Sequence, residues 1–169
     1  MNAILAAWNA AGEAAALDAM MACCGSRRWA RKIVALRPIA GVEELSEAAD
    51  RVWGTMEEPD WLEAFACHPR IGERKRARVA AQSAAWSEQE QSAVASSADR
   101  VLAGLAAGNA LYEQRYGFTF IVCATGKSAE EMLVILNRRL AGERGAELRE
   151  AAEQQRQITQ IRLGKWLIE

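Results

Sequence analysis

Apolar residues recur at intervals of three and four along most of the chain, and this spacing is typical of amphipathic helices. Alanine, which has the highest helix propensity, is abundant, and only three prolines interrupt the chain. We expect helices from about 13 to 22, from 27 to 36, from a cap at Ser87 to about 115, from a cap at Ser128 to about 141, and from about 146 to 167. The pattern therefore predicts an all-α protein, folded as a single compact multi-helix domain over residues 1–169.

Local signals place the ends of the earlier helices. Gly25 follows the first of them, and Ser26 can cap the next, which has to stop before Pro38. Pro59 suits the first turn of a short helix. That short helix carries three large apolar residues, Trp61, Leu62 and Phe65. A further helix before it is marked by a stripe of core residues, Leu45, Ala48, Ala49, Val52 and Trp53.

Two later helix starts match the capping box, in which a serine is followed three residues on by a glutamate. Ser87 with Glu90 opens the long helix, and Ser128 with Glu131 opens the one after it. The long helix is expected to be loosened at two glycines, Gly104 and Gly108. The last helix is expected to turn one side to the core, with Leu148, Ala151, Ala152, Ile158 and Leu163 on or near it.

The segment Phe118–Cys123 does not fit the helical pattern. It is apolar, β-branched and aromatic, and it lies between Gly117 and Gly126. Since a single strand has no partner in a helical chain, we expect an extended connector buried between helices. Its backbone N–H and C=O groups would then need partners, some of which a bound ligand could supply.

Composition excludes several classes of function. The 21 basic and 22 acidic side chains nearly cancel, so no overall field recruits nucleic acid or an anionic membrane. No run approaches the roughly 18 apolar residues of a membrane span. With one histidine and no Cys-x-x-Cys spacing among four cysteines, neither a zinc site nor a disulfide framework is expected. The first residues make a poor signal peptide, so we expect a reducing, cytoplasmic location.

His68 is the candidate for proton transfer, because histidine titrates near neutral pH without perturbation. Pro69 forces the backbone of His68 out of the helical region, at the end of the short helix. A cap or a surface histidine would show the same spacing. The neighbouring Cys67 could be the nucleophile of a thiol-dependent enzyme, but consecutive side chains point apart, so a buried inert cysteine is favoured.

Two further groups have both a structural and a functional interpretation. Ser87, Glu90 and Gln91 begin the long helix, where they can cap it or present free N–H groups and side chains to a ligand. Arg162 lies between two apolar residues of the last helix. It can extend along the apolar surface towards solvent, or offer a two-donor fork to a carboxylate or ureido group. Residue pattern alone leaves these alternatives open, and a non-catalytic helical binding module is one of them.

The order and spacing of several motifs resemble the 2-oxo-4-hydroxy-4-carboxy-5-ureidoimidazoline (OHCU) decarboxylase family. The similarity runs from about residue 8 to 166. The motifs that carry it are Cys24–Ala30, Arg37-Pro38, Asp60–Phe65, His68–Gly72, Trp86-Ser87 with Glu90-Gln91, Tyr112-Glu113, Tyr116–Ser128, Glu147-Leu148, Ala151–Gln154 and Ile158-Thr159 with Arg162-Leu163.

The resemblance implies an all-helical homodimer that needs no cofactor or metal and forms (S)-allantoin during urate degradation. It implies that His68 and Glu90 are catalytic. It implies substrate binding by Pro69, Ser87, Gln91, Arg162 and the backbone of Phe118, Thr119, Phe120 and Ile121. Because Glu88-Gln89 repeats the Glu-Gln pair, it is the alternative if the register shifts.

Overall fold

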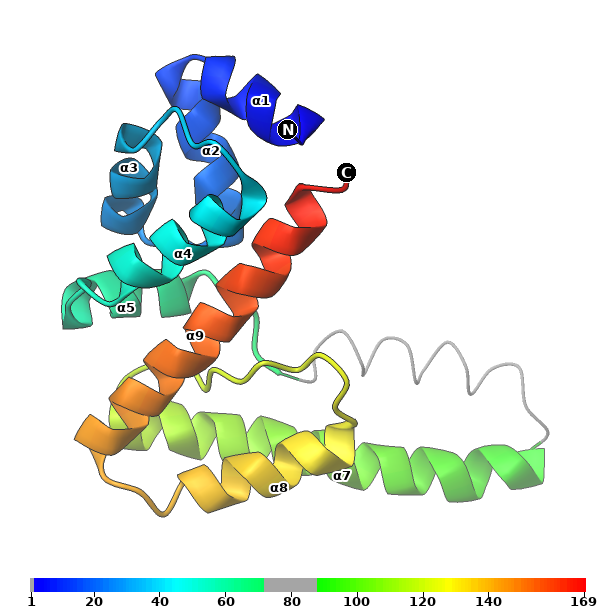
Figure 1. Ribbon diagram of the computed structural model, residues 1–169. Coiled ribbons are helices and arrows are strands. Elements are labelled where there is room, and N and C mark those ends of the chain that lie inside the picture. The colour runs from blue at the N-terminus through cyan, green and yellow to red at the C-terminus, as the bar shows by residue number, and fades with distance from the viewer. Residues whose placement is uncertain (1, 72–87) are drawn as a thin grey trace. The chain divides into compact units, whose positions relative to one another are not determined.

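The computed structural model describes residues 2–71 and 88–169, with side chains for 2–71 and 98–169 (Figure 1). Within these ranges the secondary structure consists of eight helices and no strand. They are α1 (Ala3–Ala10), α2 (Glu13–Cys23), α3 (Arg27–Ala35), α4 (Val42–Trp53), α5 (Glu58–Ala66), α7 (Glu88–Tyr116), α8 (Ala129–Arg139) and α9 (Arg144–Trp166). The predicted all-α class is confirmed.

Helix ends lie close to the positions that the caps predict. The Ser26 hydroxyl accepts the Trp29 N–H at 3.3 Å and begins α3. Ser128 and Glu131 form the full capping box of α8, with N···O distances of 3.1 and 2.7 Å. α7 begins at Glu88, next to the predicted cap Ser87, which lies outside the described residues. The pattern did not indicate α1, whose start is capped by the side chain of Asn2.

The chain divides into two compact units. Unit 1 comprises Met1–Cys67 and Glu150–Glu169, and unit 2 comprises His68–Arg149. α9 contributes its first turn and a half to unit 2 and the rest to unit 1. No helix in the described ranges has both the length and the apolarity that crossing a bilayer would demand.

Unit 1 is built around indole rings, three of which donate their N–H groups to helix carbonyls. Trp29 is fully buried and donates to the Ala49 carbonyl at 3.1 Å. Trp53 donates to Ala152 of α9 at 2.9 Å, and Trp8 donates to Ala16 at 3.0 Å. The predicted apolar stripe of α4 is buried at all five positions. Tryptophan thus supplies much of this core with three of its indole N–H groups paired, whereas among the described residues the buried Trp61 Nε1 has no hydrogen-bond partner.

In unit 2, α7 and α8 pack in parallel, because residue numbers at their contact rise together. A Cβ on Gly104 would lie 3.0 Å from Leu133, and one on Gly108 would lie 2.5 Å from Leu136. The expectation that these glycines loosen α7 is wrong, since the helix is continuous from Glu88 to Tyr116. Their role is to let α8 approach closely.

The parallel pair requires the chain to return along the helices, and the segment 117–128 does so as an extended connector (Figure 1). Five of its residues, Phe118, Phe120, Ile121, Val122 and Cys123, are buried. The predicted buried connector is therefore confirmed. Some of its carbonyls are satisfied by side chains: Ile121 accepts from Arg139, and Cys123 accepts from Lys127 at 2.8 Å.

Candidate functional site

His68 is positioned by the end of α5. The start of that helix has Pro59 in its first turn, and the Asp60 carboxylate accepts the Glu57 N–H at 3.0 Å. Cys67 ends the helix with a backbone still in the right-handed helical region. His68 follows half-buried and Pro69 exposed, so the chain leaves the helix where the His-Pro pair predicts.

The residues after His68 are tied to α7. The Arg70 guanidinium makes two parallel bonds to the Glu113 carboxylate, both of 3.0 Å. The Asn109 amide donates to the Ile71 carbonyl at 3.1 Å. A two-bond arginine–carboxylate pair also sets orientation, which a single contact would not. Arg70 and Ile71 therefore have a defined position against α7.

The connector is held by two tyrosines of the same helix. The buried ring of Tyr112 meets the rings of Phe118 and Phe120 edge-on, at centroid distances of 5.7 and 5.3 Å. The Tyr116 ring is stacked on Phe118 at 6.2 Å. Edge-on packing is a preferred arrangement of aromatic pairs. Phe118 and Phe120 thus turn towards α7, as alternate residues of an extended segment do.

The two tethered segments lie on adjacent faces of α7. At 3.6 residues per turn, Asn109 and Glu113 point within about 40° of each other, and so do Tyr112 and Tyr116. The two pairs are offset by about 60° around the helix axis. Within unit 2, the Arg70–Ile71 stretch, which follows His68, and the connector therefore contact neighbouring faces of α7.

A buried ionic cluster, formed by Tyr112, Arg139 and Glu147, also holds the connector, through a hydrogen bond from Arg139 to the Ile121 carbonyl. Arg139 Nε donates to Glu147 Oε2 at 2.9 Å, and the side chains are only 4% and 7% exposed. The Tyr112 hydroxyl donates to the same carboxylate oxygen. Burial and the Glu147 carboxylate raise the pKa of Tyr112 far above its ordinary value, so it remains a neutral donor.

Glu90 and Gln91 lie in the first turn of α7, while Ser87 and the side chains of Glu90 and Gln91 lie outside the described part of the chain. Along the helix they precede Asn109, where the Ile71 carbonyl is bound, by about five turns. The described contacts do not join these residues to His68, so their role stays a prediction that rests on the resemblance.

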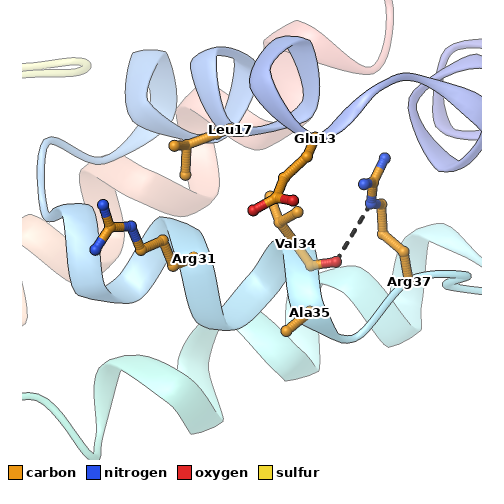
Figure 2. A pocket seen from close by; sticks show the side chains of 6 residues that line it. All are labelled: Glu13, Leu17, Arg31, Val34, Ala35 and Arg37. Atoms are coloured by element: carbon orange, nitrogen blue, oxygen red, sulfur yellow. Dashed lines mark hydrogen bonds between the residues drawn. The ribbon is translucent and has the colours of Figure 1, made fainter.

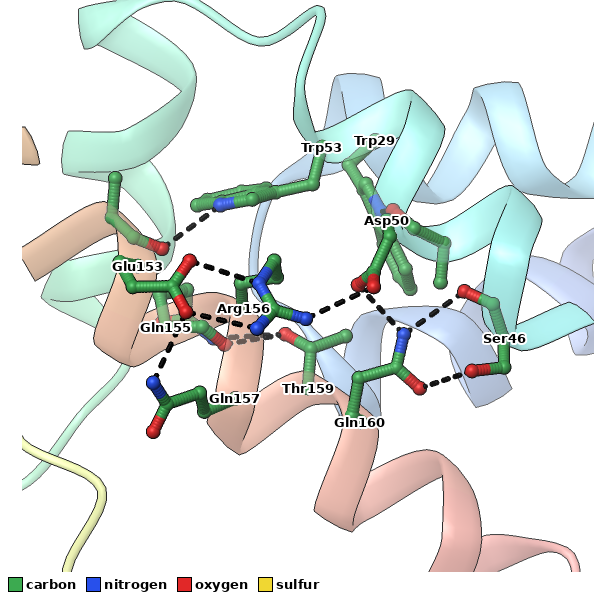
Figure 3. Close-up of polar contacts among 12 residues, drawn as sticks. Trp29, Ser46, Asp50, Trp53, Glu153, Gln155, Arg156, Gln157, Thr159 and Gln160 are labelled. Atoms are coloured by element: carbon green, nitrogen blue, oxygen red, sulfur yellow. Dashed lines mark hydrogen bonds and ion pairs between the residues drawn. The ribbon is translucent and has the colours of Figure 1, made fainter.

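Arg162 lies half-buried on the part of α9 that belongs to unit 1. A polar network fixes this part of α9 against α4 (Figure 3). Arg156 bonds Asp50 at 2.9 Å, and the Gln160 amide donates to Asp50 at 2.7 Å and to the Ser46 carbonyl at 2.9 Å. The helix that carries Arg162 therefore has a fixed rotation within unit 1.

The two thiols that interact electrostatically with Arg162 are not suited to nucleophilic chemistry. Burial raises the pKa values of Cys23 and Cys24 to about 11, and the positive charge of Arg162 opposes this only in part. Cys67 is exposed, which corrects the expectation of a buried cysteine. Its Sγ lies 3.5 Å from the Glu63 carbonyl oxygen, which cannot take up a proton to activate the thiol.

A hollow of about 270 Å³ between α2 and α3 is separate from these residues (Figure 2). It is lined by Glu13, Leu17, Arg31, Val34, Ala35 and Arg37. Arg37 is used structurally, since it donates to the Val34, Trp8 and Ala11 carbonyls at 3.3, 2.8 and 2.7 Å. None of the predicted site residues lines this hollow.

Sequence reasoning missed Tyr112, Arg139 and Glu147 as part of the site's support. Charged residues on helices are ordinarily solvated, and nothing in their spacing marks two of them as buried. The available signal was the pair Tyr112 and Tyr116, four residues apart and directly before the connector. In the described ranges, no three histidine, cysteine or carboxylate side chains cluster as a metal site would require.

Comparison with known proteins bears on the family. The sequence model of the OHCU decarboxylase family matches residues 9–164, which is nearly the whole chain. The chain belongs to the OHCU decarboxylase family. As a family member, it shares 36% identity over 149 residues with the uric acid degradation bifunctional protein TTL of Arabidopsis thaliana, covering 88% of this chain and 46% of that protein.

Another relative is the 2-oxo-4-hydroxy-4-carboxy-5-ureidoimidazoline decarboxylase of Amia calva. It is 34% identical over 97 residues, which cover 57% of this chain and 55% of the relative. This OHCU decarboxylase family member therefore spans about half the length of these two relatives.

Two solved structures resemble the fold. An OHCU decarboxylase crystallised in the presence of (S)-allantoin superposes with a TM-score of 0.71 at 31% identity, covering 90% of this chain and 99% of that chain. An (S)-allantoin synthase superposes with a TM-score of 0.69 at 17% identity, covering 96% of this chain and 53% of the other, and supports the fold alone.

Proposed function

We propose that this protein decarboxylates OHCU to (S)-allantoin in urate degradation. The observation that carries the proposal is the likeness to the OHCU decarboxylase crystallised with (S)-allantoin, which this chain matches over 99% of that structure's length. The family match runs through both units, which supports treating residues 1–169 as a single decarboxylase domain.

The reaction can proceed without an external electron sink. The substrate carboxylate is attached to a ring carbon next to a C=N bond. When the bond to CO2 breaks, its electron pair forms a carbon–carbon double bond, while the C=N electrons move to nitrogen, which takes a proton. The 4-hydroxyl then loses its proton to become a carbonyl, and the neighbouring carbon gains one, so one proton replaces CO2. The protein has to orient the substrate and move protons.

We assign these tasks to the residues that the resemblance singles out. His68 handles the 4-hydroxyl proton and helps to deliver the proton that sets the (S) configuration. The backbone of Phe118–Ile121, with Pro69, forms the pocket wall. This role is supported by the contacts of Ile71, three residues after His68, and of Phe120 with neighbouring faces of α7. The remaining substrate contacts are assigned to Ser87, Glu90, Gln91 and Arg162 from the resemblance.

The proposal extends to the state of the protein in the cell. We propose a cytoplasmic homodimer whose partner in function is the small ureidoimidazoline, with no cofactor, metal, nucleic acid or membrane involved. The near balance of 21 basic and 22 acidic side chains supports the exclusion of polyanionic partners.

The test is a coupled assay in which OHCU is produced from urate in situ and the product is followed by circular dichroism. We expect faster formation of (S)-allantoin than in the enzyme-free reaction, undiminished by a chelator and without added cofactor. Racemic allantoin at the uncatalysed rate would contradict the proposal.

A thiol-dependent enzyme is the second candidate, because Cys67 is exposed directly before His68. Cys67→Ser keeps a similar volume but removes the thiol. Under the decarboxylase proposal this variant retains the wild-type rate, whereas a thiol enzyme would lose its activity. Retained binding of a partner by inactive His68→Ala would instead favour a helical binding module.

A further inference from the structure

We propose that Arg139, held in place by Glu147 and Tyr112, is a positioning residue that fixes the backbone of the connector for substrate binding. The inference rests on the proposed function insofar as Phe118–Ile121 forms the pocket wall. It gives a role to Tyr112 and Glu147. Both residues belong to motifs that carry the resemblance to the family, but neither has a part in the proposed chemistry.

The Arg139 guanidinium uses all three of its nitrogens on different partners. Nε donates to Glu147 at 2.9 Å, Nη2 donates to the Tyr112 hydroxyl at 3.3 Å, and Nη1 donates to the Ile121 carbonyl. Because the guanidinium is planar and rigid, fixing two of these bonds determines the direction of the third. Glu147 and Tyr112 therefore aim Nη1 at the connector.

The same guanidinium also contacts the preceding residue of the connector. Its carbon lies 4.8 Å from the centroid of the Phe120 ring, in a cation–π arrangement. The Tyr112 ring also contacts Phe120, at a centroid distance of 5.3 Å. One cluster thus contacts both the side chain of Phe120 and the carbonyl of Ile121. These are two of the four residues of the proposed pocket wall.

Stability alone does not account for an ion pair at this depth. Arg139 and Glu147 are both buried, and the desolvation of two charges commonly offsets their attraction. An apolar pair could fill the same space, but it would leave the Ile121 carbonyl without a donor in a buried segment. The benefit of the ionic cluster is therefore directional, since it selects one orientation of the Ile121 peptide group.

The test compares two matched variants, Tyr112→Phe and Tyr116→Phe, in the full-length protein. Each keeps its aromatic ring and loses one buried hydroxyl. The Tyr112 hydroxyl bonds Glu147 and Arg139, whereas the Tyr116 hydroxyl lies 2.9 and 2.7 Å from the backbone carbonyls of Arg139 and Gly142. Only the first change removes a partner of the guanidinium itself, whereas the second removes bonds to backbone carbonyls.

We expect Tyr112→Phe to raise KM about tenfold with kcat nearly unchanged, since wall contacts hold the substrate and the transition state alike. Both variants should lower the melting temperature by a similar amount, because each loses one buried hydroxyl. Tyr116→Phe should do so without the rise in KM. Equal KM values in the two variants would overturn the proposal. Arg139→Lys, which keeps the charge but not the fork, should show the same rise in KM.

Hydrogen–deuterium exchange gives a readout that does not depend on turnover. The amides of residues 118–123 should exchange faster in Tyr112→Phe than in Tyr116→Phe or the wild type. Equal exchange in the three proteins would overturn the positioning role even if all three are active. An inactive wild type would contradict the proposed function, and the exchange comparison would still decide whether the cluster fixes the connector.

Discussion

At the scale of single residues, His68 lies just beyond α5, where a histidine can end a helix or carry a proton. We expect His68→Asn to lower kcat by about 10²–10⁴, the range for loss of a general acid or base, because asparagine keeps hydrogen bonding but cannot titrate. Steady-state kinetics with a thermal melt separate the two roles. An unchanged turnover with a lower melting temperature would make His68 a structural residue.

Glu90→Gln distinguishes a substrate-binding role of Glu90 from a capping role, because glutamine also completes a capping box. If Glu90 binds substrate as a charged acceptor, kcat/KM should fall by roughly tenfold or more, as for a hydrogen bond to a charged group. The melting temperature should change little. Glu88→Gln is the matched control, and a larger kinetic loss in that variant would move the site to the alternative register.

Arg162→Lys is expected to be far from conservative. Lysine keeps the charge and most of the alkyl stem, but it cannot present two parallel N–H donors to a ureido group or carboxylate. A half-made contact of this kind costs about 1–3 kcal/mol, or roughly ten- to a hundredfold in kcat/KM. Normal kinetics together with a loss of stability would remove Arg162 from the proposed site.

At the scale of helices, the contact of α7 with α8 depends on glycines. Gly108→Ala would place a Cβ 2.5 Å from buried Leu136, so we expect a destabilisation of about 1–3 kcal/mol from overpacking. Gly164→Ala on α9 is the matched control. Nothing lies within 4 Å of its Cβ position, and it should be neutral or stabilising by up to about 1 kcal/mol. Equal melting temperatures for the two variants would contradict the close helix contact.

The sequence predicted those elements whose signals are local. The serine caps at Ser26 and Ser128 and the apolar stripe of α4 depend on neighbours within one helix, and the structure confirms them. These two caps and this stripe could therefore be predicted without tertiary information, whereas the cap of α1 at Asn2 was missed.

Features that depend on contacts between distant segments could not be predicted. Gly108 weakens an isolated helix, and only the presence of Leu136 makes its missing side chain useful. Arg139 and Glu147 are charged and would be solvated on most helices, so their burial follows from packing that the pattern does not encode. For the site, the connector was found because the five apolar residues and one threonine of Phe118–Cys123 break the helical spacing, whereas the cluster that holds the connector was not found.

At the scale of the whole molecule, we expect the protein to be a homodimer in solution. Light scattering should give a mass of about twice the 18.5 kDa of one chain, independent of loading concentration in the micromolar range. A mass of one chain with full decarboxylase activity would show that dimerisation is not needed for the proposed function.

The division of unit 1 into two separated stretches has a consequence for biosynthesis. The ribosome completes residues 1–67 long before residues 150–169, yet the indole of Trp53 donates to Ala152, and Ser46 and Asp50 bond Gln160. Asn2 likewise donates to the Leu167 carbonyl. Unit 2, by contrast, is continuous and can assemble as it emerges. Unit 1 is therefore begun first but completed only after unit 2, so the nascent protein exposes the side of α4 that α9 covers until residues 150–169 have been made.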